Sequence, residues 1–256
     1  MRNVIMLDGD ILIHRATAAV QKEFKFAGPV AAITADFVEA LKIVDREILV
    51  MRRTLDAEDV FIALSDPDSS ANWRKQVLPS YKFDRTKRAK PVLFKQMRAE
   101  LESRFQTKWY PGLEGDDVLG IWVTSPGTPE RVIVSIDKDL RGVPGRLYNP
   151  NRPAEGIVAI DLASADRFHL LQTLMGDRVD GYTGIPGVGP KKAEAILDAQ
   201  HPAGMTPWQR VCHAYRRDGL TEIDALTQAR VARILRFGEW NRRVGVCLWT
   251  PQQETT

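Results

Sequence analysis

The chain of 256 residues is long enough for one substantial core or for one α/β domain with a helical appendage, and its 44% hydrophobic and 27% charged residues are ordinary for a soluble globular protein. The net charge is only +3, but it is unevenly distributed between a basic stretch and clustered acids. This distribution is typical of a protein that binds an anionic polymer beside bound metal ions. The net charge alone is equally consistent with a protein that has no such partner. No apolar run approaches the ~20 residues of a membrane span, and no signal peptide is evident. Two cysteines without a Cys-x-x-Cys pair argue against a disulfide framework. We therefore expect a cytoplasmic protein, in the host cytoplasm if viral.

Short apolar strands alternate with helices through the first half of the chain. The run from Arg131 to Ile136 is rich in β-branched residues and is typical of a strand buried on both faces of a parallel sheet. Apolar residues at helical spacing between Pro29 and Ile48 predict a long amphipathic helix. Further strands are expected at 3–7, 60–64 and 107–110, and further helices at 11–19, 91–105 and 113–122.

The second half of the chain is predominantly helical. Two weaker strands, 146–148 and 157–160, suggest a hairpin-like return, and Asp161 is the expected N-cap of a helix that ends near residue 175. Two more helices are predicted at 207–217 and 221–237. We therefore expect an α/β fold with a mostly parallel central sheet and flanking helices in residues 1–160, and a closely packed helical part in residues 161–256.

Acidic side chains gather at the predicted ends of strands. Asp8, Asp66 and Asp137 each follow a core strand, and the carboxyl ends of parallel strands meet at one edge of a sheet, where ligands bind. A single acid is usually a helix cap or a surface charge, so the argument depends on their number. The complete set is Asp8, Asp66, Glu114, Asp116, Asp117, Asp137, Asp139, Asp177 and Asp180.

So many converging carboxylates would repel one another unless cations joined them. The set contains oxygen ligands without histidine or cysteine, which favours Mg²⁺ over zinc. Two such ions about 3.5–4 Å apart can activate a water and stabilise the leaving oxygen of a phosphodiester. The acids therefore predict a metal-dependent site for phosphodiester hydrolysis.

A glycine-rich stretch, GIPGVGPKK, lies between two predicted helices. Gly184, Gly187 and Gly189 permit tight turns and close backbone approach, and Lys191 and Lys192 stand at the start of the next helix. An ordinary Gly-Pro turn is the alternative, and no Gly-Lys-Ser/Thr follows that would make a P-loop. The backbone amides and lysines favour sequence-independent binding of a DNA backbone.

Residues 73–90 are strongly basic, with interleaved aromatic residues. A solvated charged helix is the alternative interpretation of this charge. Lysine and arginine beside aromatic rings also suit single-stranded or frayed nucleic acid, because bases stack on the rings while the cations hold phosphates. The stretch is too charged for a core, and we expect an exposed helix or a mobile loop.

These motifs, in this order, resemble those of the 5′-nuclease family, which contains flap endonucleases, the 5′-nuclease domains of bacterial DNA polymerases and stand-alone bacteriophage 5′→3′ exonucleases. The resemblance extends from Asp8 to about Leu197. The motifs are LDGD, the Asp66 segment with its NWR, YK and Arg85, EGDDVLG at 114–120, SIDKDL at 135–140, GDRVD at 176–180 and GIPGVGPKKA at 184–193.

The resemblance implies a PIN-like, resolvase-type core and a two-metal Mg²⁺ site at which Mn²⁺ can substitute. One ion would draw mainly on Asp8, Asp66, Glu114 and Asp116, and the other on Asp137, Asp139, Asp177 and Asp180, with Asp117 at the border or acting through water.

The same resemblance implies how DNA is held. Lys82 and Arg85 would steer the scissile phosphate from an arch-like segment at 72–105, and Tyr81 would stack on an unpaired base. A helix–three-turn–helix element with the hairpin 184–192 would hold the duplex, with a K⁺ ion in some relatives. The implied DNA contacts are Arg74, Tyr81, Lys82, Arg85, Lys87, Gly184, Gly187, Gly189, Lys191 and Lys192.

We therefore expect a monomeric 5′→3′ exonuclease or flap endonuclease that acts on DNA ends, nicks, gaps or flaps in replication, repair or primer removal. RNA–DNA hybrids are a further candidate substrate, and a single-strand-binding protein or a polymerase a candidate partner. The alternatives are an RNase H-like or PIN-type ribonuclease and a non-catalytic DNA-binding scaffold. A PIN ribonuclease would not need the GIPGVGP hairpin, and the scaffold is disfavoured because every acidic position is filled.

Overall fold

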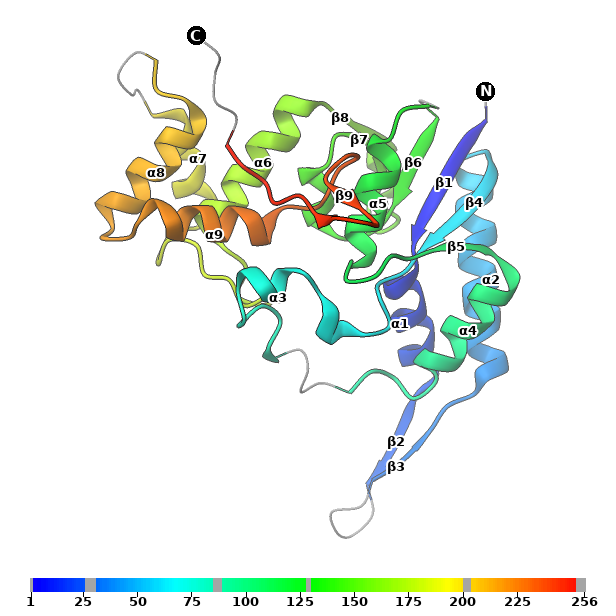
Figure 1. Cartoon of the computed structure of the whole chain (residues 1–256). Coiled ribbons are helices and arrows are strands. Elements are labelled where there is room, and N and C mark those ends of the chain that lie inside the picture. Colours follow the sequence, from blue (N-terminus) through cyan, green and yellow to red (C-terminus); the bar gives the residue numbers. More distant parts are fainter. Residues whose placement is uncertain (1, 26–30, 85–88, 128–129, 200–203, 252–256) are drawn as a thin grey trace.

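A six-stranded sheet forms the centre of the computed structural model, which describes residues 2–25, 31–84, 89–127, 130–199 and 204–251 (Figure 1). The strand order is β5-β4-β1-β6-β7-β8, and every pairing is parallel except that of β7 with β8. The mostly parallel sheet predicted from the apolar strands is confirmed. The strands are β1 (Asn3–Asp8), β4 (Ala57–Ala63), β5 (Gln106–Lys108), β6 (Arg131–Val134), β7 (Gly145–Tyr148) and β8 (Ile157–Ile160).

Helices cover both faces of this sheet because alternate side chains of each strand point to opposite sides. In β1, Ile5 and Leu7 pack into the cluster formed with α1, α2 and α4, whereas Met6 packs into the cluster formed with α5. Both clusters are apolar, which explains why the strands have near-continuous hydrophobic sequences. The helices are α1 (Gly9–Val20), α2 (Phe37–Thr54), α4 (Phe94–Arg104) and α5 (Gly115–Thr124).

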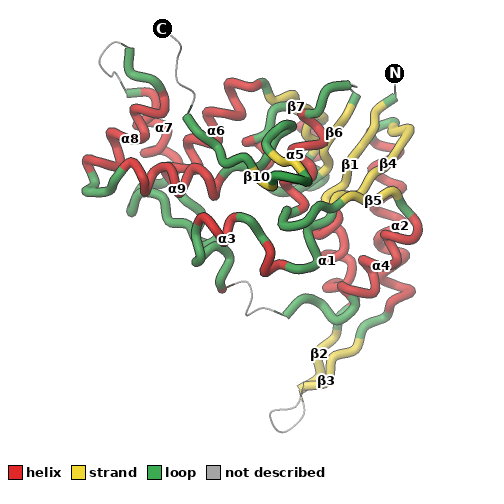
Figure 2. Tube along the Cα trace, viewed as in Figure 1, coloured by secondary structure: helices red, strands yellow, loops and turns green. Residues whose placement is uncertain are grey.

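A two-stranded hairpin replaces the beginning of the predicted 29–48 helix. Strands β2 (Lys22–Lys25) and β3 (Ala31–Thr34) pair antiparallel, and Ile33 lies opposite Glu23. Helix α2 begins only at Phe37, because the Asp36 side chain accepts a hydrogen bond from the Glu39 amide at 3.0 Å and caps it there. The hairpin projects from the lower end of α1, away from the sheet (Figure 2).

The C-terminal part is helical, as predicted, and has its own apolar core. Leu174, Ile185, Leu197 and Tyr215 are among the buried side chains where its helices meet. The predicted 221–237 helix ends at Ala232 instead, and a two-stranded hairpin follows. The elements are α6 (Leu162–Met175), α7 (Pro190–Asp198), α8 (Pro207–Arg217), α9 (Glu222–Ala232), β9 (Trp240–Asn241) and β10 (Gly245–Val246).

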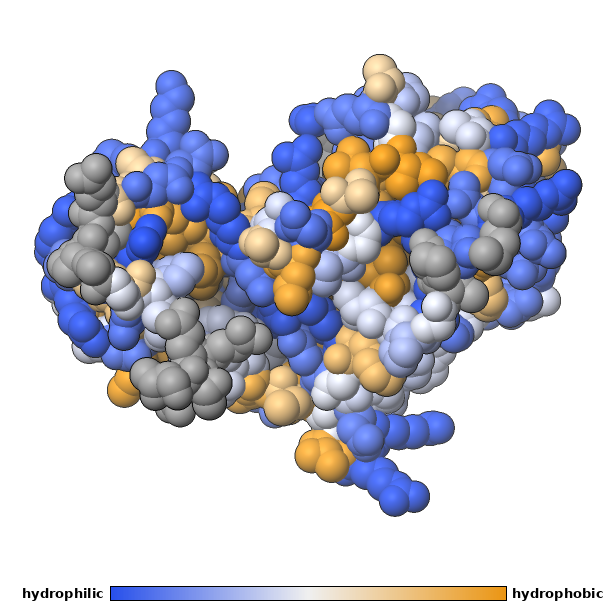
Figure 3. All heavy atoms as spheres, turned by 90° about the horizontal axis from the view of Figure 1, so that it is seen from above, coloured by the Kyte–Doolittle hydropathy of each residue, from blue (hydrophilic) through white to orange (hydrophobic). Residues whose placement is uncertain are grey.

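The carboxyl ends of the parallel strands all point to one side of the molecule, the lower side of Figure 1. The short helix α3 (Arg74–Val77) lies on this side, as does the connection between α6 and α7. The opposite side, seen from above in Figure 3, is mostly hydrophilic with an apolar strip near its middle. In the described part of the chain, no helix is long and apolar enough to cross a membrane.

Candidate active site

Asp8 is the last residue of β1 and lies where two parallel strands end side by side. It caps α1 by accepting a hydrogen bond from the Ile11 amide at 3.1 Å, and it accepts a second from the Ser135 hydroxyl at 2.9 Å. Ser135 also accepts from the Asp137 amide at 3.1 Å, so one buried hydroxyl orients both chain ends. Burial and the charges of Asp10 and Asp137 raise the pKa of Asp8 to about 7.

Asp10 also belongs to this site, although it was not among the predicted ligands. Its Oδ2 atom accepts a hydrogen bond from the Ser65 amide at 2.8 Å, while its buried Oδ1 atom has no hydrogen-bond partner within the described ranges. Among the charges around Asp8, that of Asp10 raises its pKa most. An acid two residues after a strand-end aspartate, as in the LDGD motif, was the available signal.

Two further groups of carboxylates meet at the same edge. Burial, followed by the charges of Asp137 and Asp8, raises the pKa of Asp116 well above its usual range. Burial and Asp137 also raise the pKa of Asp139 to about 7, with smaller contributions from Asp177 and Asp180. The fold thus brings acids from β1, α5, the β6 end and the loop after α6 within electrostatic reach of one another.

Glu114 remains ionised because cations surround it. Lys82 Nζ lies 2.5 Å from its Oε1 atom, and Arg74 Nη1 lies 3.2 Å from its Oε2 atom. Although burial favours the protonated form, Lys82 and Arg74 lower the pKa of Glu114 to about 2. In turn, Glu114 and Asp180 outweigh burial and raise the pKa of Lys82, so its ammonium stays charged at neutral pH.

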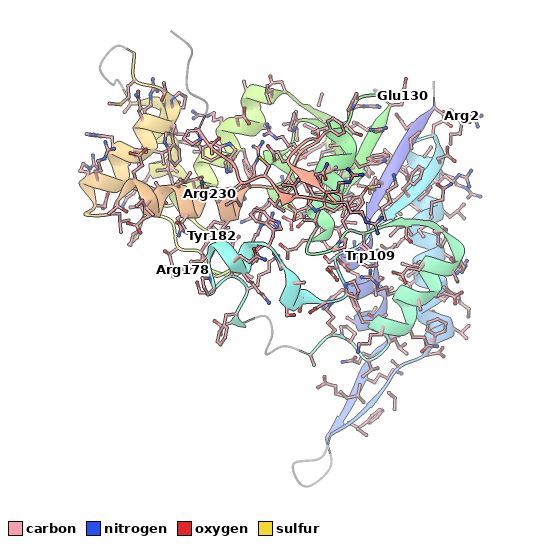
Figure 4. All side chains as sticks on the ribbon, in the orientation of Figure 1. Arg2, Trp109, Glu130, Arg178, Tyr182 and Arg230 are labelled. Atoms are coloured by element: carbon pink, nitrogen blue, oxygen red, sulfur yellow. The ribbon has the colours of Figure 1, made fainter. Side chains whose placement is uncertain are left out.

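The backbone holds Lys82 in this position. Its φ of 51° is in the left-handed region, which is uncommon for a non-glycine residue, and its amide donates to the Asp180 carbonyl at 2.7 Å. Gly181 lets the loop after α6 approach, because a Cβ there would lie 2.5 Å from the Ser80 carbonyl oxygen. Figure 4 shows the neighbouring Tyr182 directed toward α3 and Arg178 at the outer edge of the loop.

Asp117 and Arg74 form a buried clasp, in which each is the other's main partner. Their side chains are 0% and 3% exposed, and two Arg74 nitrogens each lie 2.7 Å from an Asp117 oxygen. Arg74 also donates to the carbonyls of Val231 and Arg233, and Asp117 accepts from the Leu235 amide. With these groups occupied and buried, Asp117 and Arg74 together hold the end of α9 against the core. The border position of Asp117 in the metal site and the DNA contact of Arg74 stay predictions.

Tyr81, predicted to stack on an unpaired base, is buried in this structure. Its ring is 3% exposed and packs against Tyr182 and Val231, and its hydroxyl donates to Glu114 at 2.8 Å. Tyr81 is therefore a positioning residue for Glu114. Its neighbour Phe83, which is 60% exposed, is the aromatic side chain that this turn presents to solvent.

The donor set fits hard divalent cations. It consists of carboxylates whose mutual repulsion keeps several pKa values high, and the buried Oδ1 atoms of Asp10 and Asp139 accept no hydrogen bond in the described part of the chain. Among the described residues, no three acidic, histidine or cysteine side chains are already grouped so that they could hold an ion.

Comparison with known proteins identifies the family. Residues 3–145, more than half of the chain, match the family described as "5′-3′ exonuclease, N-terminal resolvase-like domain". The chain belongs to the 5′–3′ exonuclease family. The exodeoxyribonuclease of Enterobacteria phage T3 is 28% identical, and the exonuclease of Escherichia phage T7 is 29% identical; each alignment covers 98% of this chain and 94% of the relative. The enzyme class predicted from the acidic motifs, a 5′–3′ nuclease, is confirmed.

More distant relatives extend this comparison. Flap endonuclease Xni of Shewanella sp. (strain W3-18-1) is 24% identical over 77% of this chain and 74% of its own length. The bacteriophage T5 5′-exonuclease, solved with zinc, shares the fold of this 5′–3′ exonuclease, with a TM-score of 0.57 and 16% identity over 90% of this chain and 93% of that one. A T5 flap endonuclease solved with DNA and metal ions gives a TM-score of 0.55 over the same shares.

The remaining predicted ligands of this exonuclease have local partners. Asp66 accepts hydrogen bonds from the Gly112 amide at 2.6 Å and the Asp68 amide at 2.9 Å, so both of its oxygens are engaged by backbone. Asp177 accepts from the Val179 amide at 2.8 Å and from Lys138 at 3.4 Å. Both acids lie near the carboxyl edge, but Asp66 has less free coordinating capacity than Asp10.

The glycine-rich connection 176–189 of the exonuclease links α6 to α7. Gly176 and Gly184 have positive φ and pack backbone against backbone, since a Cβ on Gly184 would lie 2.4 Å from the Gly176 nitrogen. Gly187 and Gly189 face open space, and exposed Lys191 and Lys192 begin α7. The predicted contacts Arg85 and Lys87 lie outside the described residues.

Proposed function

We propose that this 5′–3′ exonuclease hydrolyses phosphodiester bonds of DNA at 5′ ends, nicks, gaps or flaps, with two divalent ions, Mg²⁺ first and Mn²⁺ as a substitute. The observation that carries the proposal is the group of mutually repelling carboxylates beside Lys82 at the carboxyl edge of the sheet. We further propose roles in replication, repair or primer removal, for a monomer that works beside a polymerase or single-strand-binding protein.

The carboxylates divide into two sets that would hold the ions. Asp8, Asp66, Glu114 and Asp116, together with Asp10, would hold one ion, and Asp137, Asp139, Asp177 and Asp180 would hold the other; the mutual effects of these acids on their pKa values support this assignment. When bound, the ions supply an activated water and charge stabilisation at the leaving oxygen.

The protein's own groups bind and orient the strand. The charged Lys82 is positioned to exchange part of its contact with Glu114 for a phosphate oxygen, and it would stabilise the negative charge that grows during hydrolysis. Tyr81 and Arg74 keep Glu114 fixed during this exchange. Ser135 keeps Asp8 and Asp137 oriented.

The 184–192 hairpin is proposed to hold the duplex backbone, with a K⁺ ion bound at it. Exposed Lys191 and Lys192 at the start of α7 support this, because a helix N-terminus and two ammonium groups favour phosphate regardless of base sequence. Replacing both lysines with alanine should weaken binding equally across sequences and reduce its salt dependence. Loss of binding to some sequences only would contradict backbone binding.

The decisive experiment is digestion of 5′-labelled nicked duplex, blunt duplex, 5′ flap and RNA–DNA hybrid with and without Mg²⁺. We expect metal-dependent cleavage from the 5′ side, lost in Asp137→Ala while DNA binding persists. Asp59→Asn, which changes an exposed acid at the start of β4, is the matched control and should cleave normally. Cleavage in EDTA, or by Asp137→Ala at the normal rate, would refute the metal mechanism.

A further inference from the structure

A cavity of about 210 Å³ opens beside Asp8. Leu7 and Asp8 of β1 and Val134 and Ser135 at the end of β6 form its floor, and α1 and α2 form one wall. Because its floor consists of strand ends, the cavity opens at the same edge of the sheet as the candidate active site. Asp8 and Ser135 are shared between the two.

The topology of the sheet explains why a cavity exists there. From β1 the chain passes through α1 and α2 to β4 on one side, whereas β6 pairs with the other side of β1 and follows α5. Helices α1 and α2 cover one face and α5 the opposite face. The carboxyl ends of β1 and β6 therefore flank the point where the direction of winding reverses, and open α/β sheets bind ligands in this crevice.

The lining combines apolar walls with a cationic rim. Ile11, Val50 and Met51 supply part of the apolar surface, and Arg15 and Arg46 stand at the mouth. Arg15 Nη2 lies 3.8 Å from an Oε atom of Glu47, which also lines the cavity. No ion pair or hydrogen bond of Arg46 is found among the described residues. An apolar slot with two guanidinium groups at its mouth is complementary to a flat ring that carries a phosphate.

The size of the cavity limits the ligand. Pockets for drug-sized molecules occupy about 300–1,000 Å³, so this smaller cavity suits one nucleobase with part of its sugar rather than a dinucleotide. The phosphate would remain at the rim, where the two arginines lie.

We propose that this cavity is a nucleotide subsite that takes the 5′-terminal nucleotide of the strand being cut, with its base between α1, α2 and the β6 end and its 5′-phosphate on Arg15 and Arg46. The inference rests on the proposed function, because it places the scissile phosphate at Asp8. The nucleotide on the 5′ side of that phosphate is then next to the cavity mouth.

Binding of thymidine 5′-monophosphate to the full chain tests the subsite without catalysis. Calorimetry in EDTA compares wild type with Val50→Trp, which fills the cavity from a half-exposed position, and with Arg46→Ala. Val38→Trp and Arg53→Ala, at exposed positions of the same helix outside the cavity, are matched controls. Thermal melting checks that each variant is folded.

We expect wild type and both controls to bind the nucleotide, and Val50→Trp and Arg46→Ala to bind at least about tenfold more weakly. Thymidine without phosphate should bind weakly to wild type and be unaffected by Arg46→Ala. No nucleotide binding by wild type, or unchanged binding in either cavity variant, overturns the subsite. Wild-type DNA cleavage is measured in parallel: if it persists, only the subsite has failed, and if it is absent, the proposed function has failed.

Discussion

Replacing Arg74 with alanine removes one partner of the buried clasp and leaves Asp117, 0% exposed, without its counter-ion. Removing one member of a buried ion pair typically costs about 3–5 kcal/mol, because the remaining charge stays desolvated. The variant also loses the hydrogen bonds to the Val231 and Arg233 carbonyls at 2.9 and 2.6 Å. We therefore expect the free energy of unfolding to fall by about 4 kcal/mol.

Urea unfolding followed by circular dichroism measures this change. Arg217→Ala, at an exposed position in the last turn of α8, should lie within about 0.5 kcal/mol of wild type and serves as the control. A loss in Arg74→Ala below about 1 kcal/mol, together with a large loss of DNA affinity, would refute the structural role and support the predicted DNA contact.

Three further outcomes test other parts of the structure. Burial lowers the pKa of His169 to about 3, so between pH 6.5 and 3 the unfolded chain binds a proton that the native state does not. The free energy of unfolding should therefore decrease by about 2 kcal/mol from pH 7 to 5 through this group. In urea titrations at several pH values, His169→Gln should remove that part of the pH dependence. Gly184→Ala, whose Cβ would lie 2.4 Å from backbone, should lower the free energy of unfolding more than Gly187→Ala. Gly187 also has a positive φ but faces open space, so its replacement should cost about 1–2 kcal/mol in the same assay. Equal losses in the two variants would contradict the close packing at Gly184. Lys82→Ala should slow cleavage at least about a hundredfold in single-turnover assays while duplex affinity changes little, and an unchanged rate would place Lys82 outside the site.

The sequence alone was sufficient for the features that depend on local pattern. β-branched apolar runs identified the parallel strands, and acids directly after Leu7 and Ile136 marked the carboxyl edge, because strand direction and side-chain alternation follow from the backbone. Asp161 and the following apolar residues predicted α6, because an N-cap residue also acts through its immediate sequence neighbours.

Tertiary structure decided which charged groups face solvent. Asp116 and Asp117 are adjacent in sequence, yet one joins the carboxylate group while the other is enclosed by Arg74, and the basic segment conceals a buried Tyr81. The roles of these residues depend on α9, more than a hundred residues away, whose last carbonyls and following amides surround the clasp. Local sequence patterns cannot predict such a contact, because the cost of burying a charge is set by partners that only the folded chain brings together.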